Sequence, residues 1–178
     1  MNRFADYFSN YVNDDTITYI GNGDITSFTV SRQDRELAVG LNLESFIDYG
    51  IVENSQNQIA RAMELKKVHI NPRFPKSEFS LDNIERILEY VRHESPAANG
   101  FFDGCEAELE DRTLTLCLKK GGKDVLESQK VDRAIANKIY ELFDLDFVVI
   151  FLEVQAFDIE KAVQKAVEER RAEEQHKK

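Results

Sequence analysis

The sequence lacks tryptophan and any long hydrophobic run, and it contains only two cysteines and three prolines. Its longest uninterrupted apolar stretch, FVVIFL at 147–152, is far shorter than the ~20 residues that a transmembrane helix needs. The N-terminal segment MNRFADYFSNYVNDD has no apolar core of the kind found in secretory signals. We therefore expect a cytoplasmic protein without a membrane partner.

Basic residues are scarce relative to acidic ones, with 23 lysines and arginines against 33 aspartates and glutamates and a formal net charge of −10. Such a balance disfavours broad electrostatic docking on nucleic acid or on anionic lipid, although a local basic patch remains compatible with it. The composition, 42% hydrophobic and 31% charged, is that of a folded globular chain. Its 178 residues suit one medium domain or two small ones.

Motifs of common enzyme classes are missing as well: the chain contains no GxSxG, HExxH, GxxxxGK[ST], GxGxxG or CxxC. His69, His93 and His176 have no spacing typical of metal ligands. The acidic pairs, such as Asp14 and Asp15, fall mostly in predicted turns and on exposed strand faces. We therefore expect no catalytic residue, no cofactor and no metal site in these residues.

The two cysteines, Cys105 and Cys117, lie in strand-like segments that the pattern joins into one hairpin. In a cytosolic protein, cysteines without metal-ligand spacing are expected to be reduced, structural thiols. A disulfide across the hairpin is the alternative.

The first half of the chain alternates between helical and extended patterns. Aromatic residues spaced by three and four in residues 2–12 predict a short amphipathic helix, and residues 13–24 are predicted to turn twice. The elements expected next are a hairpin of 25–31 and 35–43, a helix around 53–63 and a short strand at 66–70.

The second half begins after a stiff connector, NPRFP at 71–75, in which two prolines favour an extended backbone. Ser80 is suited to cap the helix that follows, which Pro96 ends. The elements expected next are a hairpin of 105–109 and 112–120, a helical turn at 125–128, a helix at 130–143 and a buried strand at 146–154.

The two halves show the same order of elements, and parts of their sequences match. DRELAVGL at 34–41 and DRTLTLCL at 111–118 share four of their eight positions. IARAMELKKVHI at 59–70 similarly aligns its apolar positions with IYELFDLDFVVI at 139–150. Amphipathic segments of one type resemble one another by chance, but an ordered succession of matches favours an internal repeat.

We therefore predict an α+β fold with two small α/β subdomains that share ββαβ cores, at 1–74 and 75–155. Residues 156–178 contain no glycine or proline and become almost wholly charged after residue 167. They are predicted to form a charged C-terminal helix, either a frayed end or a linker.

One stretch, LKKGGKDVL at 118–126, has features of a phosphate contact. Its glycines would let backbone N–H groups approach an anion, and lysines flank them. The other interpretation is that the glycines form a turn out of a strand and the lysines keep the strand end soluble. The residues of this candidate phosphate or partner contact are Lys119, Lys120, Gly121, Gly122 and Lys123.

The predicted order of elements from residue 80 to 154, α-β-β-α-α-β, is that of a type II KH-like fold. KH modules clamp a nucleic-acid backbone with a GXXG loop between their two adjacent helices. That junction here is ESQKVD at 127–132, which contains no glycine, and Gly121-Gly122 lies one element too early. The second subdomain is therefore expected to bind protein, or nucleic acid only weakly.

Five segments together resemble the N-terminal region of bacterial PolC-type DNA polymerase III α subunits. They are LKKVHINPRFP, FSLDNIERILEYV, SPAANGFF, LTLCLKKGGKDVLES and KIYELFDLDFVVIF. The resemblance covers roughly residues 15–154 and rests on hydrophobic and Gly/Pro landmarks, without a catalytic signature. It implies a first subdomain similar to the polymerase-binding part of the clamp-loader tau subunit, a KH-like second subdomain, and a charged tail leading into an OB-type domain.

The resemblance also implies a function in DNA replication. The parent would be a DNA-directed DNA polymerase with a 3′–5′ exonuclease, and this fragment would be non-catalytic, since no polymerase or exonuclease motif matches it. Its expected partners are replisome proteins or other domains of the same polymerase, bound through open sheet edges or the apolar face of 157–167. The alternative is a KH-like module that binds single-stranded DNA or RNA near the polymerase.

Overall fold

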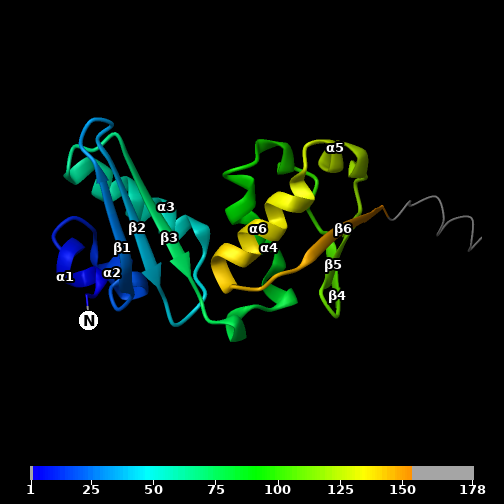
Figure 1. Ribbon diagram of the computed structural model, residues 1–178, viewed down its shortest axis with the longest axis horizontal. Helices are drawn as coiled ribbons and strands as arrows, with labels where there is room; N and C mark the ends of the chain where they lie inside the picture. Colours follow the sequence, from blue (N-terminus) through cyan, green and yellow to red (C-terminus); the bar gives the residue numbers. More distant parts are fainter. Residues whose placement is uncertain (1, 154–178) are drawn as a thin grey trace, which may run out of the picture.

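The computed structural model describes residues 2–153 and contains two three-stranded mixed sheets with helices packed against them (Figure 1). The protein is therefore of the mixed α+β class, as the sequence predicts. The predicted charged helix at 156–178 lies outside the described residues. None of the helices within residues 2–153 is both long enough and apolar enough to cross a membrane.

The first sheet has the strand order β1-β2-β3. β1 (Asp24–Ser31) and β2 (Glu36–Asn42) form the predicted antiparallel hairpin, and β3 (Lys67–Arg73) pairs parallel to β2. α3 (Tyr49–Ala62) connects these parallel strands and begins a few residues before its predicted start.

The segment before this sheet contains two short helices, which corrects the prediction of one helix followed by turns. α1 (Phe4–Phe8) lies where the first helix was expected, but α2 (Asp14–Ile20) occupies the segment predicted to turn. α2 begins after Asn13, whose side-chain oxygen accepts a hydrogen bond from the Thr16 N–H at 2.9 Å. The cap and two acidic residues in the first turn stabilise a helix whose apolar pattern is too short to be conspicuous.

The second sheet has the order β4-β5-β6 and the same strand directions as the first, an antiparallel pair followed by a parallel pair. β4 (Glu106–Glu110) and β5 (Thr113–Leu118) form the second predicted hairpin. α5 (Lys123–Ser128) and α6 (Val131–Phe143) lead to β6 (Val148–Glu153).

Four helical segments lie between β3 and β4. The Ser80 hydroxyl accepts a hydrogen bond from the Asp82 N–H at 3.2 Å, so the predicted cap is confirmed, although it caps a 3₁₀ turn that leads into the helix. The segments are η1 (Lys76–Glu78), η2 (Leu81–Asn83), α4 (Ile84–Arg92) and η3 (Pro96–Ala98).

β3 continues through residues that the sequence assigns to a connector, which is a second correction. The Leu43 N–H donates to the Arg73 carbonyl at 2.8 Å, so the backbone of Arg73 faces β2. The Ile70 N–H instead donates to the Gln56 side chain at 2.8 Å, on the free edge. Because these directions alternate, Pro72 also faces the free edge, where no N–H is required of it.

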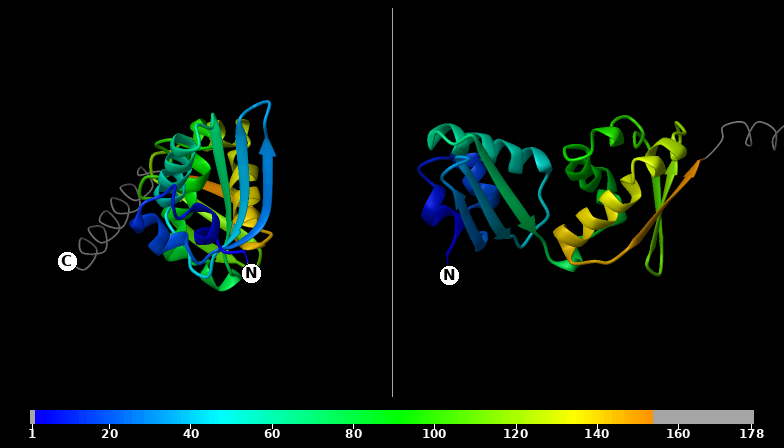
Figure 2. Two further views of the ribbon diagram at one scale, coloured as in Figure 1. Left: turned by 90° about the vertical axis from the view of Figure 1, so that its left-hand side faces the viewer. Right: turned by 45° about the horizontal axis from the view of Figure 1, so that its top comes forward.

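Helices cover one face of the second sheet and lie between the two sheets (Figure 1). α4 and α6 occupy this position in both Figure 1 and the right-hand view of Figure 2. The opposite face of β4, β5 and β6 points away from the first half, and no helix of the described residues covers it. Within residues 2–153, one face of this sheet is therefore open.

An aromatic cluster joins the two halves. The rings of Phe46 and Phe74, from the first half, have centroids 5.6 and 5.7 Å from that of Phe143 at the end of α6. The Phe74 N–H also donates a hydrogen bond to the Leu142 carbonyl at 2.7 Å. The buried side chains of both halves form one hydrophobic cluster, so the halves share a core.

Both cysteines are free thiols, so the alternative of a cross-hairpin disulfide is wrong. Glu106 pairs with Cys117 in the hairpin register, which offsets the two cysteines by one residue. Neighbouring residues of a strand point to opposite faces, so Cys105 enters the core while Cys117 lies on the open face. Burial raises the pKa of both thiols, so both are protonated at neutral pH.

Candidate interaction surface on the second sheet

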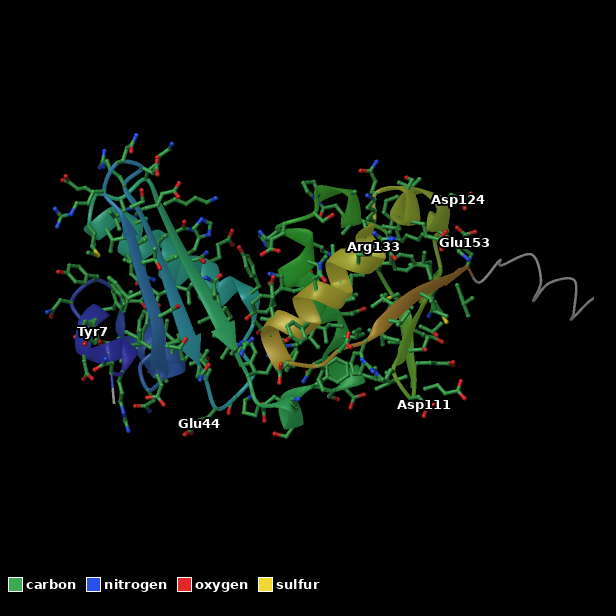
Figure 3. All side chains as sticks on the ribbon, viewed as in Figure 1. Tyr7, Glu44, Asp111, Asp124, Arg133 and Glu153 are labelled. Atoms are coloured by element: carbon green, nitrogen blue, oxygen red, sulfur yellow. The ribbon has the colours of Figure 1, made fainter. Side chains whose placement is uncertain are left out.

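The lysine- and glycine-containing turn lies at one end of the second sheet, between β5 and α5. In Figure 3, Asp124 and Glu153 mark this end and Asp111 marks the hairpin tip at the other. Gly121 and Gly122 have φ angles of +69° and +97°, and Gly122 immediately precedes α5. The glycines therefore supply the left-handed backbone by which the chain leaves the strand.

The three lysines of this turn each pair with a carboxylate of the protein itself. The pairs are Lys119 with Glu106 at 2.8 Å, Lys120 with Asp103 at 2.8 Å, and Lys123 with Glu127 at 3.7 Å. The hydrogen bond from Lys120 lowers the pKa of Asp103, and that from Lys119 lowers the pKa of Glu106. A phosphate group would therefore compete with these carboxylates for the lysines.

The backbone around this turn is similarly engaged. The Lys123 N–H, at the start of α5, donates to the Glu153 carboxylate at 2.7 Å. At the junction of α5 and α6, where a KH module carries its GXXG loop, Lys130 adopts a left-handed conformation with φ +55°. A lysine side chain there limits the approach of a sugar–phosphate backbone that glycine would permit.

Gly122 is expected to be intolerant of substitution, whereas Gly50 is not. An added Cβ at Gly122 would lie 2.2 Å from the Phe101 ring, at a positive φ, while at Gly50 it would meet nothing within 4 Å. Gly122→Ala should lower the free energy of unfolding by about 1–2 kcal/mol, and Gly50→Ala in α3 should raise it by about 0.5 kcal/mol. Urea denaturation of both variants measures this, and equal effects would contradict it.

The open face of the second sheet carries side chains sorted by type along each strand. Three rows cross it from β4 through β5 to β6, set by the strand register: Glu106–Cys117–Leu152, Glu108–Thr115–Ile150 and Glu110–Thr113–Val148. β4 thus contributes an acidic column, β5 a column of small side chains, and β6 an aliphatic column. The glutamates come from a hairpin and the aliphatic residues from a strand that follows two helices, so only the register brings them together.

The aliphatic column is unusually exposed for its residue types. Val148, Ile150 and Leu152 are 62%, 41% and 48% exposed, whereas the alternating Val149 and Phe151 are buried against the helices. The prediction of a buried strand at 146–154 is therefore wrong for every second residue. When helices cover a single face of a sheet, each strand buries only half of its side chains, even if the other half are apolar.

The acidic column is only partly neutralised. Glu106 pairs with Lys119, but no ion pair among the described residues involves Glu108 or Glu110. Arg112, next to this column at the hairpin end, pairs with Asp146. The open face therefore presents an apolar strip along β6 and a strip of net negative charge along β4, separated by the small side chains of β5.

A second candidate region is the cleft between the two halves, with a volume of about 710 Å³. Lys138 of α6 lines it and is 12% exposed, with its ammonium 2.6 Å from both Glu94 and Glu141. Burial alone would lower the pKa of Lys138, but these two carboxylates outweigh burial and raise it. Tyr49 stacks on His93 at the same cleft, with ring centroids 3.9 Å apart. The ion pairs of Lys138 lie within the second half, whereas the Tyr49–His93 stack joins the two halves.

Within residues 2–153, no group of three or more histidine, cysteine, aspartate or glutamate side chains is arranged to hold a metal ion. The sequence matches no protein-family model, and a comparison with curated proteins finds no significant match. The candidate surface therefore has to be interpreted from its own chemistry.

Proposed function

We propose that this chain is a non-catalytic N-terminal part of a PolC-type replicative DNA polymerase. Its role would be to hold other replisome proteins, or other domains of the same polymerase. The polymerase and exonuclease sites of the parent enzyme belong, in this proposal, to regions outside these residues. The first half would correspond to the polymerase-binding part of clamp-loader tau and the second to a KH-like module.

The observation that carries the proposed role is the open face of the second sheet. An aliphatic column exposed on a sheet face is typical of a surface that another protein covers, because solvent exposure of Val148, Ile150 and Leu152 is unfavourable. These side chains alternate with the buried Val149 and Phe151, so they project from the face of the second sheet that points away from the first half; Figure 2 shows the direction of that face. A partner can therefore reach it without separating the halves.

The finer description of the fold is also part of this proposal. Both sheets have an antiparallel pair followed by a parallel pair, with a helical crossover before the last strand, which supports an internal repeat. The order α4-β4-β5-α5-α6-β6 supports a type II KH-like second subdomain. A KH-like frame without a glycine loop, with its lysines paired internally, favours protein binding over nucleic-acid binding.

A binding experiment tests this role directly. We expect the full chain to form a complex, in the micromolar range typical of transient interfaces, with purified clamp-loader tau subunit or with a PolC-type α subunit lacking the matching region. Isothermal titration calorimetry would measure the dissociation constant of this complex. Ile150→Asp should weaken the complex about tenfold or more, because it places a charge at the centre of the aliphatic column. Val30→Asp, on the exposed edge strand of the first sheet, is the matched control. If neither protein formed a complex with the chain, the proposal would be contradicted.

The alternative function is binding of single-stranded nucleic acid, and it is favoured by the KH-like order of elements alone. Fluorescence anisotropy with a labelled single-stranded DNA oligonucleotide at physiological salt distinguishes the two. We expect no binding. Micromolar, salt-sensitive binding that is lost on combined Lys119→Ala, Lys120→Ala and Lys123→Ala substitution would replace the proposed function with this alternative.

A further inference from the structure

We infer that the open face of the second sheet binds one amphipathic helix, with an apolar stripe along β6 and a row of lysines or arginines over β4. This inference rests on the proposed function and specifies the partner. It follows from three properties of the face: the aliphatic column, the acidic column, and the flat, small-residue column between them.

The aliphatic column defines where the apolar stripe lies. Val148, Ile150 and Leu152 are separated by one residue each, so their side chains project in one line on the open face. Six residues of β6 at ~3.3 Å each extend about 20 Å, the length of about 13 helical residues at ~1.5 Å each. A helix of that length presents an apolar residue to this line at every turn.

The acidic column defines the charge of the partner's flank. Glu108 and Glu110 are exposed and take part in no ion pair among the described residues, while Glu106 is held by Lys119. Neighbouring strands lie ~4.8 Å apart, so β4 is about 10 Å from β6, close to the diameter of a helix. A helix lying over β5 and β6 therefore places one polar flank above β4, where lysine or arginine complements the glutamates.

The central column permits this close approach. Thr113, Thr115 and Cys117 are short side chains, so a helix placed over them can approach the backbone of β5 closely. A helix axis can settle over this column with its apolar stripe on one side and its basic flank on the other.

Two other occupants fit the face less well. A second copy could stack face to face with its β6 over the β6 of the first, but the two acidic columns would then face each other. If its β6 lay over β4 instead, aliphatic side chains would face glutamates. A strand added to the free edge of β6 would bond to the outward-facing backbone of Val149 and Phe151 and would leave the open face uncovered.

A pair of designed peptides tests the inference. Both are 14-residue helices with one leucine stripe, flanked on one side by lysines in the first and by glutamates in the second. We expect the full chain to bind the lysine-flanked peptide about tenfold more tightly in fluorescence anisotropy, with a gain of helical circular dichroism on binding. Glu108→Lys combined with Glu110→Lys should reverse the preference, and Val148→Thr combined with Ile150→Thr should weaken both peptides about tenfold.

Two control variants test whether the effects on peptide binding are specific to the open face. Val30→Thr and Glu44→Lys change an exposed aliphatic and an exposed acidic residue elsewhere, and neither should alter peptide binding. Equal binding of both peptides, an unchanged preference after the charge reversal, or binding without a gain of helix would overturn the inference. A dimer of the chain in sedimentation, dispersed by Ile150→Thr, would assign the face to a second copy instead.

The peptide experiment and the titration with replisome proteins test separate statements. If tau or the polymerase binds and the peptide preference is absent, the proposed function holds but the helix-binding face is wrong. If the peptide preference is present and no replisome protein binds, the face is an interaction site of another kind of protein. Each result therefore addresses one statement only.

Discussion

Replacing Phe143 with alanine is expected to lower the free energy of unfolding by about 3–5 kcal/mol, the range for truncating a fully buried phenylalanine. Phe143 is 1% exposed at the end of α6, and its ring contacts Phe46, Phe74 and Phe79. Alanine would remove the centre of the cluster that joins the two halves, and the surrounding rings are too rigid to fill the space. Urea denaturation followed by circular dichroism measures the change.

Tyr140→Ala is the matched control for this experiment, because Tyr140 lies on the same helix and is 50% exposed. We expect it to change the free energy of unfolding by about 0.5 kcal/mol or less. A loss below about 1 kcal/mol for Phe143→Ala, or equal losses for the two variants, would show that the aromatic cluster does not stabilise the junction.

Removing the hydroxyl of Tyr90 is expected to have the second largest effect. This hydroxyl donates a buried hydrogen bond to the Ile47 carbonyl at 2.9 Å, from α4 of the second half to a loop of the first. Tyr90→Phe keeps the ring that packs against Phe46 and Tyr49 but leaves that carbonyl without its partner. The free energy of unfolding should fall by about 1–3 kcal/mol, the cost of a buried unsatisfied polar group.

The same hydroxyl makes stability depend on pH above about 10, where an exposed tyrosine ionises. Burial of the phenol, and next the nearby carboxylate of Asp48, raise the pKa of Tyr90 above that of the unfolded chain. The unfolded chain therefore loses this proton first, so the contribution of Tyr90 is complete below pH ~10 and declines as the pH rises further. Tyr90→Phe should flatten this decline.

The control for Tyr90 is Tyr7→Phe, because Tyr7 is an exposed tyrosine on α1. It should leave the free energy of unfolding at neutral pH unchanged, because the side chain of Tyr7 is half exposed. The slope of stability against pH between about 10 and 12 is measured for the wild type and for Tyr90→Phe. If Tyr90→Phe leaves that slope unchanged, the buried phenol is not the group responsible for it.

The hairpins were predictable because alternation of apolar and polar residues is a local property. ITSFTVS and RELAVGLNL lie in β1 and β2, and the corresponding segments of the second half lie in β4 and β5, within two residues of the predicted ends. α2 was missed because its stability comes from the Asn13 cap rather than from an apolar stripe. The strand continuing through Pro72 was missed because a proline is tolerated only on an edge, and the sequence does not reveal which strand is an edge.

The candidate surface was predictable only in part. The apolar character of FVVIFL is plain in the sequence, but a continuous apolar run does not show whether one face or both faces of a strand are covered. Likewise, Lys119 and Lys120 look free in the sequence, and only the folding of Glu106 and Asp103 against them neutralises them. Both features depend on contacts between residues that the chain brings together from different elements.

The sequence by itself determined the fold class, the two hairpins and the helices α3, α4 and α6, because each follows from periodicity within a few residues. Only the tertiary structure decided that α4 and α6 cover one face of the second sheet and leave the other open. The strand register then placed Glu108, Thr115 and Ile150 in one row. Whether a side chain is exposed depends on what packs against its face of the sheet. That packing is a property of the whole chain rather than of any one segment.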